Sequence, residues 1–160
     1  MTGFLTRWFR SEPRLSEAAP RDAAMFAALH AASFSRGWSE HEFERLLSER
    51  NVVAHRATCG RALAGFILSR IAAGEAEILS VAVARPRRGG GIGRRLLDLH
   101  LRRLAGLEVR TVFLEVDEDN LPAVRLYGRA GFREVGRRAG YYPRAGQKPA
   151  AALVLRRDLA

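Results

Sequence analysis

The sequence predicts a mixed α/β domain built on one central sheet, and three observations support this fold class. The 160 residues suit one domain that buries its own core. Helix and strand patterns alternate along the chain, and no repeat or long linker divides it. A glycine-rich segment stands between a strand pattern and a helix pattern in mid-chain. Hydrophobic residues make up 48% of the chain, which argues against a disordered protein.

The first half predicts two helices and three strands. Residues 1–12 are expected to form a tail, and residues 13–160 the domain. Apolar spacing predicts a helix over 21–32, and a second helix is expected to begin at Ser39, which forms a capping box with Glu42. Strands are expected at 51–58, 61–72 and 75–84, with Cys59-Gly60 as the turn of a hairpin.

The second half predicts a helix after the glycines, then a strand, a helix and two closing strands. Asn120 is a good N-cap, and Gly131 stands where a helix end favours a positive φ. The expected elements are a helix through 96–104, a strand at 111–116, a helix at 121–130, and strands at 132–138 and 150–156.

The charge and the cysteine count narrow the function classes. The formal net charge is +10, and Lys148 is the single lysine beside 26 arginines. Coding bias and an anionic partner both remain open as causes, but no finger, zipper or RNA-binding motif supports nucleic-acid binding as the main function. Cys59 is the single cysteine, so no internal disulfide forms. No apolar run approaches the ~18 residues of a membrane helix, and we find no secretory signal pattern. We therefore expect a cytoplasmic protein that binds neither DNA nor membrane.

The glycine-rich segment predicts an anion site. Glycines at 89, 90, 91 and 93 lead into a helix, whose first amides lack partners and favour negative charge. Arginines at 87, 88, 94 and 95 add positive charge, so a diphosphate fits. A Walker loop is excluded because its lysine and hydroxyl are missing, and the dinucleotide fingerprint fails at Arg94 or Leu96.

Two residues suggest acid–base chemistry, and each has a simpler interpretation. Glu115 lies in an apolar strand, where alternation puts it on the face of Phe113 and opposite Val112 and Leu114. It is a candidate base, or an acid that reaches solvent or pairs with an arginine. Tyr127 follows in a helix, where it is a candidate proton donor or a core tyrosine.

These motifs resemble those of a known superfamily. The spacing Arg88-x-x-Gly91-x-Gly93 resembles the Gln/Arg-x-x-Gly-x-Gly/Ala signature of the GCN5-related N-acetyltransferase (GNAT) superfamily. Further segments are similar to those of its RimI-type subgroup, the ribosomal-protein-alanine N-acetyltransferases. They are Phe34 to Ser39 with Phe43, Leu114-Glu115-Val116, Asn120, Leu126-Tyr127, Gly131-Phe132 and Tyr141-Tyr142-Pro143.

The resemblance implies a GNAT fold, in which a mostly antiparallel sheet contains a splayed strand pair, and acetyl-coenzyme A as acyl donor. It implies Glu115 as base and Tyr127 as proton donor, and no metal; the four histidines show no metal-ligand spacing. Acceptor contacts would be Trp38, Tyr141 and Tyr142. Coenzyme contacts would be Val81, Ala82, Val83, Arg88, Gly89, Gly90, Gly91, Ile92, Gly93, Arg94, Asn120 and Tyr127.

The expected function is acetyl transfer to a protein N-terminal amine, with the alanine of a small-subunit ribosomal protein as the implied acceptor. Two alternatives remain open. The acceptor could be a lysine side chain, a polyamine or another small amine. The chain could also be a non-catalytic module that binds acyl-coenzyme A, although the presence of both Glu115 and Tyr127 counts against that.

Overall fold

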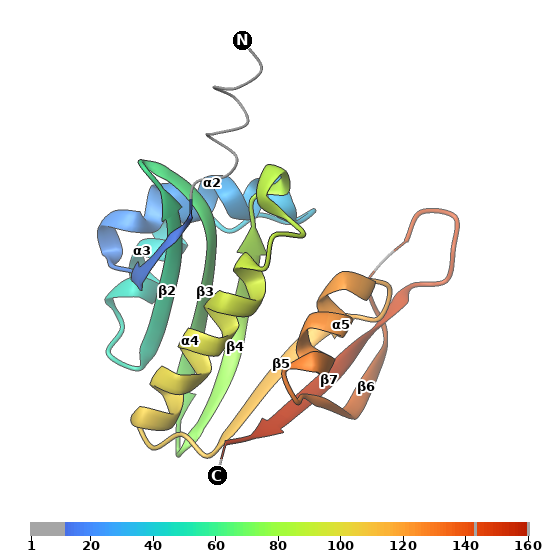
Figure 1. Ribbon diagram of the computed structural model, residues 1–160. Coiled ribbons are helices and arrows are strands. Elements are labelled where there is room, and N and C mark those ends of the chain that lie inside the picture. The colour runs from blue at the N-terminus through green and yellow to red at the C-terminus, as the bar shows by residue number, and fades with distance from the viewer. Residues whose placement is uncertain (1–11, 143, 160) are drawn as a thin grey trace.

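The protein folds around a twisted sheet that is antiparallel except at one strand pair (Figure 1). A computed structural model describes residues 12–142 and 144–159. Within these residues the sheet has seven strands in the order β1-β2-β3-β4-β5-β7-β6. The strands are β1 (Arg14–Glu17), β2 (Val52–Cys59), β3 (Ala62–Ala72), β4 (Glu75–Val83), β5 (Thr111–Asp117), β6 (Arg133–Tyr142) and β7 (Ala150–Asp158).

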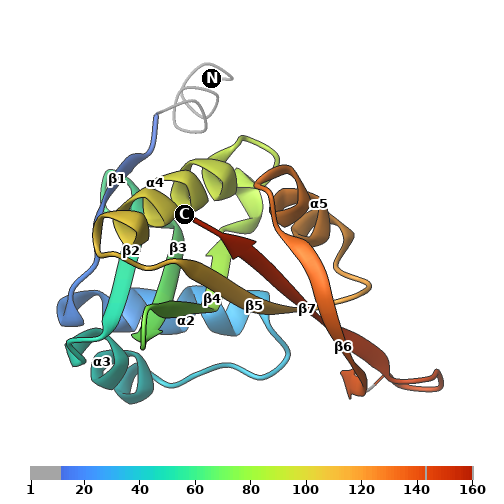
Figure 2. The same cartoon turned by 90° about the horizontal axis from the view of Figure 1, so that it is seen from below.

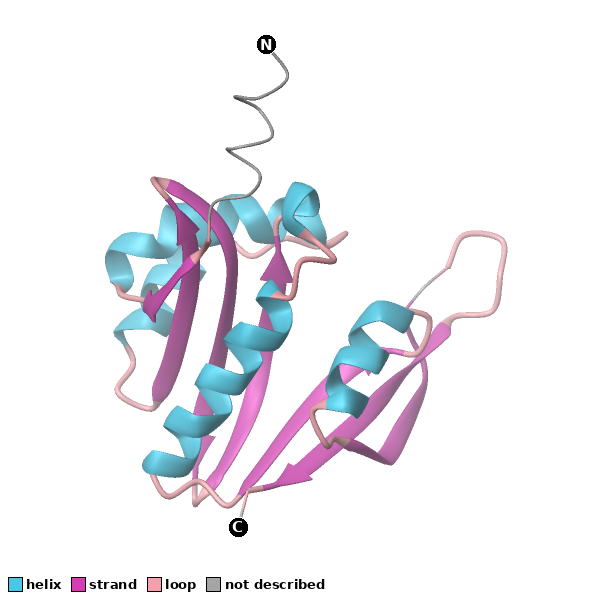
Figure 3. Cartoon of the chain, in the orientation of Figure 1, coloured by secondary structure: helices cyan, strands magenta, loops and turns pink. Residues whose placement is uncertain are grey.

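Helices cover both faces of the sheet (Figures 2 and 3). The helices α4 and α5 lie on one face, and α2 and α3 lie on the other, so the core forms two clusters. No helix in the described part of the chain is both long and apolar enough to cross a membrane. The helices are α2 (Ala23–Ser33), α3 (Glu40–Ser48), α4 (Ile92–Gly106) and α5 (Leu121–Arg129), with 3-10 turns η1 (Pro20–Asp22) and η2 (Arg85–Arg87).

The predicted caps are confirmed. Ser39 Oγ accepts from the Glu42 amide at 3.1 Å, and the Glu42 carboxylate accepts from the Ser39 amide at 3.2 Å. Asn120 Oδ1 accepts from an amide in the first turn of α5 at 3.3 Å, and Gly131 has φ +89°. These positions follow from local chemistry, so their spacing in the sequence was enough to find them.

The sequence analysis missed one strand and two short 3-10 turns, and it misplaced one hairpin turn. Strand β1 was not predicted, because its four residues are too short to show a periodicity. The first hairpin turns at Gly60-Arg61, one residue later than expected, because β2 continues through Cys59. The expected tail falls almost wholly on residues 1–11, which lie outside the described residues.

The parallel pair β4–β5 confirms the expected splayed strands. The two strands pair only through Glu75 with Thr111, Ala76 with Val112, and Glu77 with Phe113. Beyond these residues they diverge toward the start of α4 (Figure 1). On its other side β4 stays paired with β3, with a register shift between Leu68 and Ser69. A bulge of this kind bends a strand and increases its twist.

A buried polar chain crosses the core beneath α4. His100 of α4 is 2.8 Å from His55 of β2 between their Nδ1 atoms, and its Nε2 is 2.6 Å from Ser69 Oγ of β3. His100 and Ser69 are fully buried. Burial, and then the nearby His55, lower the pKa of His100 to about 3. Burial also lowers the pKa of His55. The folded protein therefore holds both imidazoles neutral at neutral pH.

We predict that these histidines make the protein sensitive to mild acid. The unfolded chain takes up a proton on His100 near pH 6.5, whereas the folded protein does so only near pH 3. Stability should therefore be complete above pH 6.5 and fall below it, by about 2 kcal/mol at pH 5 from His100 alone. Urea unfolding between pH 5 and 8 measures this. His100→Gln should flatten the slope, whereas exposed His41→Gln should not; an unchanged slope in His100→Gln would contradict the prediction.

We also predict that Gly65 of β3 tolerates no side chain. A Cβ there would lie 2.9 Å from the Ala82 carbonyl oxygen and 3.1 Å from Leu96 Cδ1. Gly65→Ala should therefore lower stability by about 1–3 kcal/mol, as overpacking does. Gly128→Ala is the matched control, because Gly128 is helical and has nothing within 4 Å of its Cβ position. That change should be neutral or stabilising; equal melting temperatures for the two variants would exclude the steric reason.

Candidate active site

The glycine segment forms an open backbone surface at the start of α4. Gly89 and Gly91 have φ of +81° and +84°, and a Cβ at either position would have nothing within 4 Å. Gly91 is the N-cap and carries no side-chain cap. The first hydrogen bond between a helix amide and the cap runs from Arg95 N to Gly91 O, so the first-turn amides face outward without helical partners. A diphosphate fits this surface, since its oxygens accept from such amides.

Three arginines around this surface already form hydrogen bonds or ion pairs within the protein. Arg88 Nε donates to the Val83 carbonyl at 3.0 Å, which ties the loop to the end of β4. Arg94 pairs with Asp98 at 3.0 Å, and Arg95 pairs with Glu12 at 3.0 Å. All three side chains are substantially exposed. They can therefore add positive charge next to the helix start, and the bond of Arg88 holds the loop against β4.

The remaining predicted coenzyme contacts take different positions. Ile92, the first residue of α4, is 4% exposed and its side chain packs in the core, so its backbone amide, not its side chain, is available to a ligand. Ala82 points to the opposite cluster, whereas Val81 and Val83 pack toward α4. The oxygen of Asn120 is used as the cap of α5. A Cβ at Gly93 would lie 3.4 Å from Leu126 and 3.6 Å from Val83, so the start of α4, the end of β4 and α5 meet there.

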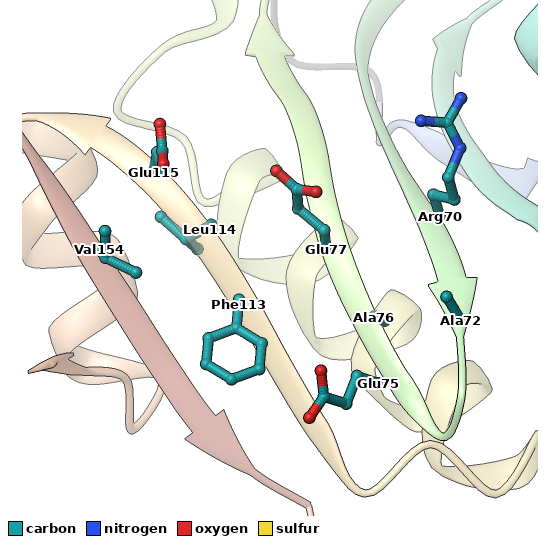
Figure 4. Close-up of a pocket in the computed structure, with 9 residues that line it drawn as sticks. All are labelled: Arg70, Ala72, Glu75, Ala76, Glu77, Phe113, Leu114, Glu115 and Val154. Carbon is teal, nitrogen blue, oxygen red and sulfur yellow. The ribbon is translucent and has the colours of Figure 1, made fainter. Parts of the chain in front are cut away.

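A hollow opens beside the point where β4 and β5 part, and we call it the β4–β5 hollow. Its volume is about 320 Å³. Figure 4 shows Glu75 and Glu77 from β4 and Phe113 and Glu115 from β5 on its walls. The predicted face of Glu115 is confirmed, since the alternating residues Val112 and Leu114 are buried in the core cluster on the α4 and α5 side of the sheet. The hollow therefore lies on the face that α2 and α3 cover elsewhere.

Glu115 is held by an arginine that the sequence analysis did not find. Nη1 of Arg138, on β6, donates to both carboxylate oxygens, at 2.9 and 3.2 Å. This bond and the charge of Glu115 raise the pKa of Arg138. The guanidinium also lies 4.6 Å from the ring centroid of Tyr141. The structure thus agrees with the alternative interpretation, in which Glu115 is an acid paired with an arginine. A basic role for Glu115 requires Arg138 to give way to the acceptor.

Tyr127 is a core residue with a buried phenol. It is 7% exposed, and its ring meets Phe132 edge-on with the centroids 5.7 Å apart. Burial raises the pKa of Tyr127, so the hydroxyl keeps its proton at neutral pH. Both interpretations of the sequence therefore agree with its position. A protonated phenol is a suitable donor, and the ring packs as a core tyrosine does.

The predicted acceptor residues lie in two separate parts of the fold. Trp38 lies between α2 and α3 and stacks on His30 at 4.7 Å between centroids. Tyr141 and Tyr142 end strand β6 and meet edge-on at 5.0 Å, while Pro143 lies outside the described residues. The loop after them is tied to the end of β5 by an ion pair of Arg144 with Asp117.

Two residues of the site were missed by sequence reasoning. Arg138 is 23 positions from Glu115, and no local pattern links them. Glu77 follows from the alternation that placed Glu115, because Ala76 and Ile78 are buried under α4. The signal for Glu77 was therefore present, and the signal for Arg138 was not. Among the described residues, no cluster of histidine, cysteine and carboxylate side chains could hold a metal ion.

Known proteins share both sequence and fold with this chain. It is 33% identical over 106 residues to the [Ribosomal protein bS18]-alanine N-acetyltransferase of Escherichia coli K12, covering 66% of this chain and 71% of that protein. A crystal structure of the E. coli ribosomal-protein-S18-alanine N-acetyltransferase superposes with a TM-score of 0.85 at 24% identity, over 92% of this chain and 94% of the other.

Two further proteins extend the comparison. The mycothiol acetyltransferase of Streptomyces bingchenggensis is 44% identical over 75 residues, which span 46% of this chain but only 24% of that longer protein. Arabidopsis thaliana NAA60 in complex with acetyl-CoA superposes with a TM-score of 0.81 at 22% identity, over 92% of this chain and 98% of the other. At these identities the two superpositions show a shared fold.

The family model described as "Acetyltransferase (GNAT) family" matches residues 23–132. That range includes the splayed strands, the open start of α4 and both candidate acid–base residues. The chain therefore belongs to the GNAT family of acetyltransferases.

Proposed function

We propose that this chain moves an acetyl group from acetyl-coenzyme A to the α-amine of a protein N-terminus, with the alanine of a small-subunit ribosomal protein as acceptor. The observation that carries the proposal is the position of Glu115, on the wall of the β4–β5 hollow where the strands part. A ribosomal acceptor would place the reaction in the cytoplasm. The relative that acts on ribosomal protein bS18 supports this acceptor.

The donor would bind through the start of α4 and the free side of β4. First-turn amides and the open positions of Gly89 and Gly91 suit the two phosphates. Strand β4 past Glu77 has no partner on its β5 side, so its backbone groups suit the amides of the pantetheine arm. The expected contacts Val81, Ala82 and Val83 stand on this stretch. Bound donor supplies the activated acetyl group, and the residues of this chain position it.

Glu115 and Tyr127 would move the protons. An α-ammonium loses its proton near pH 8, so a carboxylate at the mouth of the hollow can take that proton directly or through water. The buried, protonated phenol of Tyr127 would give a proton to the departing sulfur. Alignment of amine and thioester should contribute most of the rate, as in other reactions that join two bound substrates.

One observation supports a second acceptor class. The match to a mycothiol acetyltransferase has the higher identity, although it covers less than half of this chain. A small amine therefore remains the alternative acceptor, along with a lysine side chain or a polyamine. The choice depends on the acceptor side of the site, where Trp38 and Tyr141 are predicted contacts.

We predict that coenzyme A release with an alanine-initiated peptide exceeds release with the same peptide blocked at its N-terminus. The panel should also contain a lysine peptide, spermidine and an aminoglycoside. A free-thiol assay with acetyl-coenzyme A measures turnover, and mass spectrometry locates the acetyl group. Preference for a small amine or a lysine side chain would replace the proposed acceptor. Absence of turnover combined with tight acetyl-coenzyme A binding would indicate the non-catalytic module.

We predict that Glu115→Gln loses activity mainly below about pH 8, where the acceptor is an ammonium. The loss at pH 7 should be about 10-fold, because only about one tenth of an amine with a pKa near 8 is neutral there. Glu134→Gln is the matched control, because Glu134 is also a strand glutamate bound to an arginine, Arg137, at 3.4 Å. Its pH–rate profile should match that of the parent protein. Equal activity of Glu115→Gln at all pH values would remove Glu115 from the role of base.

A further inference from the structure

Ser80 of β4 carries a buried hydroxyl that has no partner. The residue is 7% exposed. Among buried side-chain nitrogen and oxygen atoms of the described residues, its Oγ alone forms no hydrogen bond. Native proteins rarely leave such a group unsatisfied, because burial removes the hydrogen bonds that water would supply. The hydroxyl therefore indicates a group that arrives from outside the chain.

A serine on the neighbouring strand shows the contrast. Ser69 of β3 is buried as well, at 0% exposed, but its Oγ is 2.6 Å from His100 Nε2. The core thus provides a hydrogen-bond partner for the hydroxyl of Ser69 and none for the hydroxyl of Ser80. The two differ in place, since Ser69 lies within the hydrogen-bonded network beneath α4, and Ser80 lies on the part of β4 that β5 has left.

The strand registers place Ser80 level with Glu115. On β3, Arg70 pairs with Glu77 and Leu68 pairs with Ser80. Measured along β3, Ser80 is therefore two residues further than Glu77, because the bulge adds one extra residue to β4. Glu77 pairs with Phe113 on β5, and Glu115 stands two residues beyond Phe113. Ser80 and Glu115 are therefore at the same height on the two diverging strands.

Both side chains also face the same side of the sheet. Residues that pair directly across antiparallel strands point to one face, and Leu68, the partner of Ser80, packs in the cluster under α2 and α3. Glu115 points to that face as well, because Val112 and Leu114 pack in the cluster on the opposite face, which α4 and α5 cover. A donor arm between the strands would thus have the hydroxyl on one side and the carboxylate on the other.

We propose that Ser80 is a catalytic residue that donates a hydrogen bond to the carbonyl oxygen of the bound thioester, and this rests on the proposed function. The amine nitrogen forms the new C–N bond, and the C–S bond breaks. Glu115 receives the amine proton, and the sulfur takes a proton from Tyr127. Ser80 keeps its own proton throughout and stabilises the negative charge that the oxygen carries during attack.

The absence of a hydrogen-bond partner favours the role of oxyanion donor over that of nucleophile. A serine nucleophile needs a base in hydrogen-bond contact with its Oγ, and no described residue provides one. A donor to a developing oxyanion needs the opposite, namely a hydroxyl that has no bond to break before it turns to the substrate. Ser80 therefore forms no acetyl-serine, and transfer is direct.

The test compares Ser80→Ala and Ser80→Cys with the parent protein. With saturating acetyl-coenzyme A, Ser80→Ala should lower kcat about 10- to 100-fold, below the range for a main oxyanion-hole donor. The thiol is a weaker donor, so Ser80→Cys should fall between the two. Calorimetric affinity for acetyl-coenzyme A should change less than about 2-fold, because the bond strengthens only as charge develops. The melting temperature of Ser80→Ala should be equal or higher, because an unsatisfied hydroxyl is removed.

Ser69→Ala is the matched control and should behave in the opposite way. It should lower the melting temperature, because His100 loses its partner, and leave kcat unchanged. The proposal is overturned if Ser80→Ala has parental kcat, or if its kcat and melting temperature fall together. If Ser80→Ala does not fold, Ser80→Cys decides by the same two measurements.

The outcome is separable from that of the proposed function. If another amine is acetylated and the peptide is not, the proposed acceptor is wrong. The kcat values of the Ser80 variants can then be compared with that amine as acceptor. Slow hydrolysis of acetyl-coenzyme A, with water as acceptor, gives the same comparison. A protein that binds acetyl-coenzyme A and transfers its acetyl group to nothing, water included, overturns both proposals.

Discussion

The site depends on a pair of parallel strands that are held together at one end and free at the other. Parallel neighbours need a crossover, and α4 supplies it between β4 and β5. The buried leucines 96, 97, 101 and 104 fix α4 to the sheet. The three paired positions from Glu75 to Glu77 hold β4 and β5 together at the start of β4. The bulge that follows in β4 turns the rest of that strand away from β5. The opening is thus built into the sheet and does not require a moving part.

The crossover helix also carries the charge that the opening needs. A helix usually places acids in its first turn, since the positive end of its dipole favours them. α4 has none there and has Arg94 and Arg95 instead, so its start breaks a local rule. Such conflicts are expected at functional sites, where a ligand completes what the chain leaves unbalanced. An external anion would complete this one, and the free backbone positions at Gly89 and Gly91 leave room for it.

Local rules predicted much of the fold and part of the site. Capping at Ser39 and Asn120, the positive φ of Gly131 and the face of Glu115 all follow from residues within a few positions of each other. The contacts that were missed join distant segments: Arg138 with Glu115 across 23 positions, and His55 with His100 across 45. Ser80 could not be found from its sequence neighbours, because what distinguishes it is the lack of a bond in three dimensions.

The ion pair at Glu115 constrains where acceptor choice is made. Its side chains are 56% and 30% exposed, so water screens the attraction between the two charges and the pair stabilises the fold little. An acceptor ammonium that displaced Arg138 would therefore lose little affinity, whichever molecule carried it. Glu115 thus discriminates poorly between one primary amine and another. Under the proposed function, selectivity would come from contacts with the rest of the acceptor, for which Trp38, Tyr141 and Tyr142 are the predicted residues.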